Sequence, residues 1–205
     1  MGSNFGDLNK DGFPDFYLST GSPQFNNIYP NKMYLTIDGK MVEDVSYSGG
    51  FGHLQKGHAV AFADLDNDGD QDVYNVIGGA YPGDNFNNAL FVNPGNNNNF
   101  LYVTLEGKTT NKAAIGSKIE VFSKDSSGKK KVSRKVVNCG GSFGCSPIKR
   151  QEIGLGTSNS IDSVRIHWAN KNHQIQTIKD VEPNTWIKIS ELESSVEKLN
   201  LKNPT

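Results

Sequence analysis

The chain has 205 residues, 35% of them hydrophobic, and a net charge of −1. This length allows one large domain or two small ones, and no apolar run approaches the roughly 18–20 residues that span a membrane, so we expect no membrane insertion. The charge is uneven: residues 1–100 carry −8 and residues 101–205 carry +7, so the first half suits cation binding, and nothing predicts a nucleic acid partner.

An acidic loop begins almost at the first residue. No signal peptide is visible, and Met1–Ser3 is typical of an artificial leader, so we expect a fragment of a longer chain with no strand before the loop. The loop, Asp7–Asp15, offers side-chain oxygens at alternate positions and has a glycine after the third. Its expected metal ligands are Asp7, Asn9, Asp11, the backbone carbonyl of Phe13, and Asp15. A strand is predicted directly after it, at residues 16–20.

A second acidic loop, Asp64–Asp72, follows predicted strands at residues 32–37, 41–45 and 58–62. Carboxylates on alternate residues repel one another and suit no apolar core, whereas Ca²⁺ binds about six to eight oxygens from a flexible loop. The glycine at position 69 allows the sharp turn around the ion. The expected ligands are Asp64, Asp66, Asp68, the backbone carbonyl of Asp70, and Asp72, with the side chain of Asp70 in water.

The EF-hand shares the first half of this pattern and differs after it. An EF-hand needs a glutamate at loop position 12 and a helix on each side. Position 12 counted from Asp64 is Asn75, and residues 73–77 are β-branched and aromatic, which predicts a strand. The two loops start 57 residues apart, which indicates a repeated strand–loop–strand unit and disfavours two chance acidic turns.

Short strands continue through the second half of the chain, separated by turn residues. They are expected at residues 89–92, 100–105, 117–123, 131–137, 150–153, 163–168, 174–178 and 185–189. Val164, Ile166 and Trp168 alternate with polar residues and therefore predict one buried face. This spacing of strands and turns predicts an antiparallel sandwich or barrel.

The asparagine-rich residues 93–99 resist packing and predict a domain boundary. We therefore divide the chain into calcium-binding repeats at residues 1–99, a β domain at residues 100–191 and a polar tail at residues 192–205.

Two features of the second half leave alternatives open. Lysines surround the turn at Ser126–Gly128, and they are either solvated side chains at a hairpin tip or a surface that binds polyanions. Cys139 and Cys145 enclose five residues, so they form either a short disulfide, which fits an oxidising compartment, or two free thiols.

Both halves resemble known modules. The paired loops are similar to FG-GAP (VCBS-type) repeats, the calcium-binding blades of integrin-like β-propellers. Residues 114–121, 140–144, 153–156 and 161–168 resemble the ASPIC/UnbV domain, which follows FG-GAP repeats in cartilage acidic protein and in many secreted bacterial proteins. The chain departs from that pattern at Ala169, where the family usually has proline, and at the two cysteines, but at no expected calcium ligand.

The resemblance implies an all-β fold with two propeller-like blades followed by a β-sandwich-like ASPIC/UnbV domain. It also implies an extracellular or periplasmic calcium-binding module for protein interaction or adhesion, with a protein or glycan ligand at the cell surface. A carbohydrate- or polyanion-binding module and an accessory domain of a secreted enzyme are the alternatives. We expect no enzymatic activity, because the sequence has no GxSxG, HExxH or P-loop pattern and no identifiable base for Ser142.

Two blades cannot close a propeller, which needs about four to eight. Their open sheet edges must be covered in another way, and we expect the blades to pack against neighbouring sheets of the same chain. The residues expected to be buried there are Phe5, Phe16, Phe62 and Val73.

Overall fold

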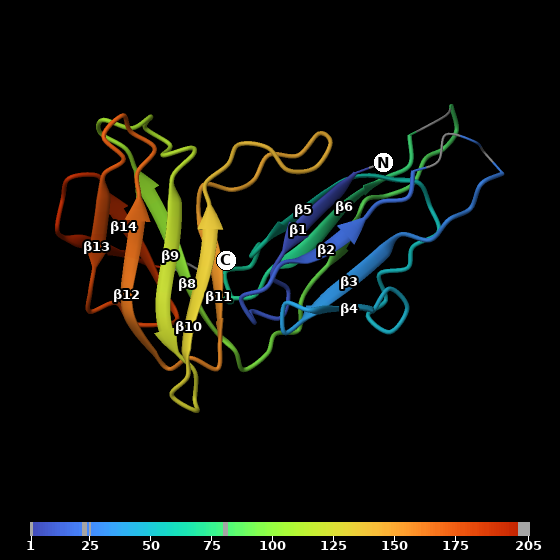
Figure 1. Ribbon diagram of the computed structural model, residues 1–205. Coiled ribbons are helices and arrows are strands. Elements are labelled where there is room, and N and C mark those ends of the chain that lie inside the picture. Colours follow the sequence, from blue (N-terminus) through green and yellow to red (C-terminus); the bar gives the residue numbers. More distant parts are fainter. Residues whose placement is uncertain (1, 22–23, 25, 80–81, 201–205) are drawn as a thin grey trace.

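The structure, a computed structural model, describes residues 2–21, 24, 26–79 and 82–200. Within these residues the regular secondary structure consists of β-strands alone, so the predicted all-β class is confirmed (Figure 1). None of the described segments is a helix long and apolar enough to cross a membrane. The strands form four sheets, two from the first half of the chain and two from the second.

The two N-terminal sheets have the strand orders β1-β2-β3-β4 and β5-β6-β7, with antiparallel neighbours throughout. The strands are β1 (Ser3–Gly6), β2 (Asp15–Leu18), β3 (Lys32–Ile37), β4 (Met41–Asp44), β5 (Gly57–Ala63), β6 (Asp72–Ile77) and β7 (Ala89–Phe91). Each acidic loop joins the first two strands of its sheet. The expectation that no strand precedes the first loop is wrong, because β1 gives it the same hairpin setting as the second.

Apolar side chains from both N-terminal sheets form one core. Its buried members are Tyr17, Met33, Phe51, Val60, Phe62 and Val73. The prediction that Phe62 and Val73 are buried is confirmed, but Phe5 is 62% exposed. Phe5 lies opposite the half-buried Phe16 in the β1–β2 pair, on the face away from Tyr17 and the core. Burial of Phe5 was therefore predicted wrongly, because it lies on the outer face of the sheet.

The two C-terminal sheets have the orders β10-β9-β12-β13 and β11-β8-β14-β15 (Figure 1). Their strands are β8 (Asn99–Glu106), β9 (Lys118–Lys124), β10 (Lys130–Val136), β11 (Gln151–Gly156), β12 (Ser160–His167), β13 (Ile175–Ile178), β14 (Thr185–Ser190) and β15 (Val196–Leu199). One large apolar cluster draws side chains from both sheets. It includes Val164, Ile166 and Trp168, as their alternation predicted.

Two features of the C-terminal sheets were not predicted. β14 pairs with β8 in parallel, with Thr185 opposite Leu101, whereas the sequence predicted antiparallel strands. β15 lies within the stretch expected to be a polar tail, and it pairs with β14 along the sheet edge. Strand spacing alone does not fix the direction in which a long connection returns, and β15 has too few apolar residues to give a strand pattern.

The asparagine-rich stretch at residues 93–99 is not an unpacked linker. Asn93 Nδ2 donates to the carbonyl of Leu8 (2.8 Å), and Asn98 Nδ2 donates to that of Asn9 (2.8 Å). The carbonyl of Asn96 accepts a hydrogen bond from Lys10 Nζ (3.3 Å). The stretch therefore packs against the first acidic loop.

Candidate metal centre

The two acidic loops have the same internal hydrogen bonds, 57 residues apart. The last carboxylate of each accepts a hydrogen bond from the second backbone amide, Leu8 N to Asp15 Oδ2 (2.8 Å) and Leu65 N to Asp72 Oδ2 (3.0 Å). Their other oxygens accept from the next strand or loop, Thr36 N and Asn93 N respectively. This carboxylate therefore ties each loop closed and anchors it to its own sheet.

The sharp turn of each loop is also repeated. Gly12 N donates to Asp7 Oδ2 (2.9 Å), and Gly69 N donates to Asp64 Oδ2 (3.1 Å). Both glycines have left-handed backbones, with φ of 85° and 100°, which side chains disfavour. The repeated unit inferred from the spacing is thus present in the backbone.

The second loop gathers three carboxylates. One oxygen from each of Asp64, Asp66 and Asp68 lies within 4.8 Å of the others, and this is the one such cluster of acidic, histidine or cysteine side chains among the described residues. Asp64 is buried, whereas Asp68 is exposed. Partial burial, followed by repulsion from Asp66 and the other carboxylates, raises the pKa of Asp68. A bound cation would remove this repulsion.

The first loop contains two carboxylates whose pKa values are strongly raised. Burial, with repulsion from Asp11 and Asp15, raises the pKa of Asp7 to about 7. Burial also raises the pKa of Asp15 to about 6. Asp7 Oδ1 is buried and accepts no hydrogen bond from the part of the chain that the structure describes. Such an oxygen fits a metal ligand, because an unpaired buried carboxylate is otherwise costly.

The donor set is of the kind that hard cations take, Ca²⁺ among them. It consists of carboxylate, amide and carbonyl oxygens on hairpin loops, and hard oxygens are the ligands that Ca²⁺ takes. The residues expected as ligands lie along the two loops, with Asp7, Asn9, Asp11, the Phe13 carbonyl and Asp15 on the first and Asp64, Asp66, Asp68 and Asp72 on the second. Their role as metal ligands stays a prediction. Asn9 and Asp11 also bond to each other, through Asn9 Nδ2 and Asp11 Oδ2 (3.1 Å).

The side chain of Asp70 corrects one prediction. It was expected to face water, but Asp70 is 4% exposed and its Oδ1 lies 2.7 Å from Lys10 Nζ of the first loop. Only its backbone carbonyl remains a candidate ligand. This contact could not be predicted, because Lys10 lies 60 positions earlier in the chain and the residues around Asp70 give no sign of it.

Three residues that the sequence analysis missed surround the second loop. Tyr102 Oη donates to Asp64 Oδ2 (2.7 Å), and one guanidinium nitrogen of Arg150 donates to the carbonyl of Asp64 (2.7 Å). Another nitrogen of Arg150 donates to Asn67 Oδ1 (2.7 Å). Glu152 forms an ion pair with Arg150 (2.8 Å). The one signal in the sequence was an arginine and a glutamate two residues apart at the start of strand β11.

The C-terminal sheets contact the first loop as well. Gly156 N donates to the carbonyl of Lys10 (2.7 Å), and Lys131 Nζ donates to the carbonyl of Asp11. Burial lowers the pKa of Lys131. The turn at Ser126–Gly128 is a hairpin tip between β9 and β10, as predicted, but Lys131 near it is not a solvated side chain.

The two cysteines are free thiols. The disulfide interpretation of Cys139 and Cys145 is therefore corrected in favour of its alternative. Partial burial raises the pKa of the Cys145 thiol.

Comparison with family models finds two matches in this chain. An FG-GAP-like repeat matches residues 7–74, and ASPIC and UnbV matches residues 107–196. No curated protein matches the chain. The first match contains both acidic loops, and the second spans β9 to the start of β15. The chain therefore carries an FG-GAP-like repeat region followed by an ASPIC and UnbV domain.

Proposed function

We propose that this chain is a calcium-binding interaction module of an extracellular or periplasmic protein, with a protein or glycan ligand at the cell surface. FG-GAP-like repeats and ASPIC/UnbV domains are modules of extracellular type, which supports the location. In this proposal the N-terminal sheets are two propeller-like blades, and the C-terminal sheets are a β-sandwich that shares one apolar core.

One observation carries the calcium assignment. Two hairpin loops, 57 residues apart, fold their carboxylates into the same hydrogen-bonded arrangement, although each arrangement brings like charges together. A bound Ca²⁺ would supply the positive charge that offsets this repulsion and would cross-link the two ends of each hairpin loop. The chain's own residues supply the rest: Asp15 and Asp72 close the loops, and Gly12 and Gly69 form the turns.

We infer that the module acts by binding and not by catalysis. The acidic side chains serve as metal ligands in this proposal, and a cation-bound carboxylate is a poor general base. Ser142, the residue considered as a nucleophile, has a structural contact instead, because its Oγ accepts a hydrogen bond from Val60 N (3.3 Å). The alternative is an accessory domain of a secreted enzyme, and such a domain would also act by binding.

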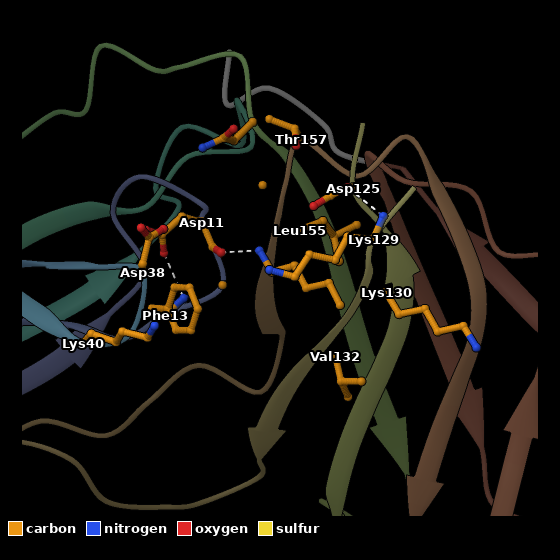
Figure 2. Close-up of a pocket in the computed structure, with 14 residues that line it drawn as sticks. Asp11, Phe13, Asp38, Lys40, Asp125, Lys129, Lys130, Val132, Leu155 and Thr157 are labelled. Carbon is orange, nitrogen blue, oxygen red and sulfur yellow. Dashed lines mark hydrogen bonds between the residues drawn. The ribbon is translucent and has the colours of Figure 1, made fainter. Parts of the chain in front are cut away.

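A second candidate function, binding of an anionic glycan or other polyanion, rests on a cavity of about 670 Å³ between the two halves (Figure 2). Asp11 and Phe13 of the first loop lie on one side, and the β9–β10 hairpin lies on the other. Four lysines line it: Lys40, Lys129, Lys130 and Lys131. Asp125, an acidic lining residue, accepts three hydrogen bonds within its own turn. Asp11 and Asp38 also line the cavity, so the four lysines give it only a small excess of positive charge.

Calorimetric titration of the metal-free protein with Ca²⁺ tests the first proposal. We expect binding at two sites, abolished at one of them in Asp66→Ala and at the other in Asp11→Ala. Absence of calcium binding at millimolar concentration would refute it.

A glycan array, run with and without EDTA, tests the second candidate. Loss of an array signal in a Lys129→Gln/Lys130→Gln variant, but not in Lys171→Gln/Lys179→Gln, would assign the binding to this cavity.

A further inference from the structure

We propose that the second calcium loop is completed by the C-terminal domain, with Tyr102 and Arg150 as positioning residues for Asp64. The calcium affinity of this loop then depends on the docking of a domain that supplies no ligand itself. This inference rests on the proposed function and adds residues outside the loop, from strand β8 and the approach to strand β11.

Tyr102 occupies one of the two oxygens of Asp64 and so leaves the other to bind a cation. Asp64 Oδ2 accepts hydrogen bonds from Tyr102 Oη (2.7 Å) and from Gly69 N (3.1 Å). Asp64 Oδ1 accepts only one, from Asp68 N (3.2 Å). With Oδ2 occupied, Oδ1 is the oxygen left to bind a cation. Tyr102 is 1% exposed and sits on β8, so it holds this orientation only while the two halves are docked.

Arg150 fixes the backbone of the same loop from a second direction. Its guanidinium donates to the carbonyl of Asp64 and to the side chain of Asn67, and its centre lies 4.5 Å from the ring of Tyr102. Asn67 has a left-handed backbone (φ 63°), a conformation that such an anchor helps to maintain. The geometry is typical of the planar, multiply donating arginine and would not be reproduced by lysine.

The positive charge of Arg150 does not cancel the charge of the calcium site. Glu152 forms a 2.8 Å ion pair with it, and both side chains are at most 5% exposed. Glu152 also accepts a hydrogen bond from Gln71 Nε2 (2.6 Å), within the second loop itself. The pair therefore holds the loop in position without adding net charge. It can strengthen cation binding without repelling the cation.

The first loop lacks this support. Its hydrogen bonds from the C-terminal sheets go to the carbonyls of Lys10 and Asp11, from Gly156 N and Lys131 Nζ. No side chain of the described C-terminal residues hydrogen-bonds to Asp7, the counterpart of Asp64. Coupling to the C-terminal domain through a ligand side chain is thus specific to the second loop. By linkage, a cation that prefers the docked arrangement stabilises the docking by the same factor.

The clean variant is Tyr102→Phe, which removes one hydroxyl and keeps the ring. It is compared with Tyr17→Phe, which removes a buried hydroxyl in the N-terminal core that donates to the carbonyl of Phe51. Both are made in an Asp11→Ala chain, so that titration with Ca²⁺ reports the second loop alone. We expect about tenfold weaker binding for Tyr102→Phe, the effect of one hydrogen bond to a charged group, and less than twofold for Tyr17→Phe.

Amide hydrogen exchange of residues 99–106 and 151–156 supplies a readout independent of affinity. Calcium should slow exchange there in the parent chain, and this slowing should be reduced in Tyr102→Phe but retained in Tyr17→Phe. If Tyr102→Phe does not fold, Arg150→Lys takes its place, with the same expectations. Equal calcium affinity in parent and variant would overturn the inference while leaving the calcium sites intact. A parent chain that binds no calcium would overturn the proposed function itself.

Discussion

Lys10 of the first acidic loop and Asp70 of the second form a 2.7 Å ion pair whose side chains are only 7% and 6% exposed. Lys10 is at loop position 4, where a left-handed backbone (φ 56°) turns its side chain towards the other hairpin. Asp70 N in turn donates to Asp68 Oδ1 (2.9 Å), a member of the carboxylate cluster. The pair therefore connects the two candidate calcium loops directly.

The connection predicts that Lys10→Met destabilises the protein by about 3–5 kcal/mol, because it leaves the buried Asp70 unpaired. The double variant Lys10→Met/Asp70→Leu should recover most of that loss, since it removes both charges. Denaturant unfolding of both variants checks this.

An exposed ion pair of the same sheet serves as the control. Lys32 and Asp44 are 3.0 Å apart, with side chains 26% and 42% exposed. Lys32→Met should cost at most about 1 kcal/mol. Equal losses for Lys10→Met and Lys32→Met would show that the buried pair has no special role.

Calcium should raise the melting temperature. A ligand that binds only the folded state stabilises it by about 2.7 kcal/mol when its concentration is a hundred times Kd. For a chain of this size that corresponds to roughly 5–10 °C. Thermal unfolding followed by circular dichroism, with Ca²⁺ and then with excess EDTA, measures the shift, and Mg²⁺ at equal concentration serves as the control. An unmoved transition contradicts the calcium assignment of both loops.

The second loop should bind calcium more tightly than the first. It offers four side-chain carboxylates as ligands where the first offers three and an asparagine, and affinity follows ligand charge and rigidity. Asp66→Ala should therefore remove the tighter of two calorimetric transitions, and Asp11→Ala the weaker. The reverse assignment would mean that burial of Asp7, not the number of carboxylates, sets the order.

The local part of these sites could be predicted from the sequence because it follows from residue spacing. Alternate carboxylates and a glycine at the turn lie within each short loop, and the structure has the strand after each loop where it was expected, although the strand before the first loop was missed. Most strand positions also follow from short apolar patterns. Such patterns describe only neighbours along the chain.

The contacts between the loops and the C-terminal domain could not be predicted in this way. Tyr102, Arg150 and Lys10 each contact a residue 38 to 86 positions away, and nothing in their own neighbourhoods identifies the partner. Polar groups that pair in a buried interface look in sequence like solvated ones. The exposed position predicted for Asp70 was wrong for this reason, and for the same reason the solvated alternative does not hold for Lys131.

Glu191 should make the C-terminal domain sensitive to acid. Its carboxylate is buried, which opposes ionisation, but it accepts six hydrogen bonds from residues 108–110 and Asn170. Together these hydrogen bonds outweigh burial and hold the pKa of Glu191 well below its usual range. Because folding lowers this pKa, ionised Glu191 contributes its full stabilisation at pH values above its pKa in the unfolded chain. That stabilisation is lost as the pH falls through its pKa in the folded chain.

The matching variant is Glu191→Gln, which cannot accept all of these donors. We expect a loss of about 1.5–3 kcal/mol near pH 7, of the size of a hydrogen bond to a charged group. The gap between wild type and variant should stay constant from pH 8 to about 5 and shrink at lower pH. Urea unfolding across this range measures it, and a gap independent of pH would contradict the ionised state of Glu191.

At Gly154, strand β11 lies directly against the first loop. A Cβ at this position would lie 2.1 Å from Asp7 Oδ2 and 2.6 Å from the backbone of Lys10, so Gly154→Ala must push the loop away. We expect overpacking to lower the free energy of unfolding by about 1–3 kcal/mol or more. We also expect weaker calcium binding at the first loop, because Asp7 is displaced.

Gly140→Ala is the matched control: a Cβ there meets no atom within 4 Å, and stability should change by less than about 0.5 kcal/mol. Calorimetry and denaturant unfolding of both variants provide the test. If Gly154→Ala binds calcium as tightly as Gly140→Ala does, strand β11 does not hold the first loop in its binding geometry.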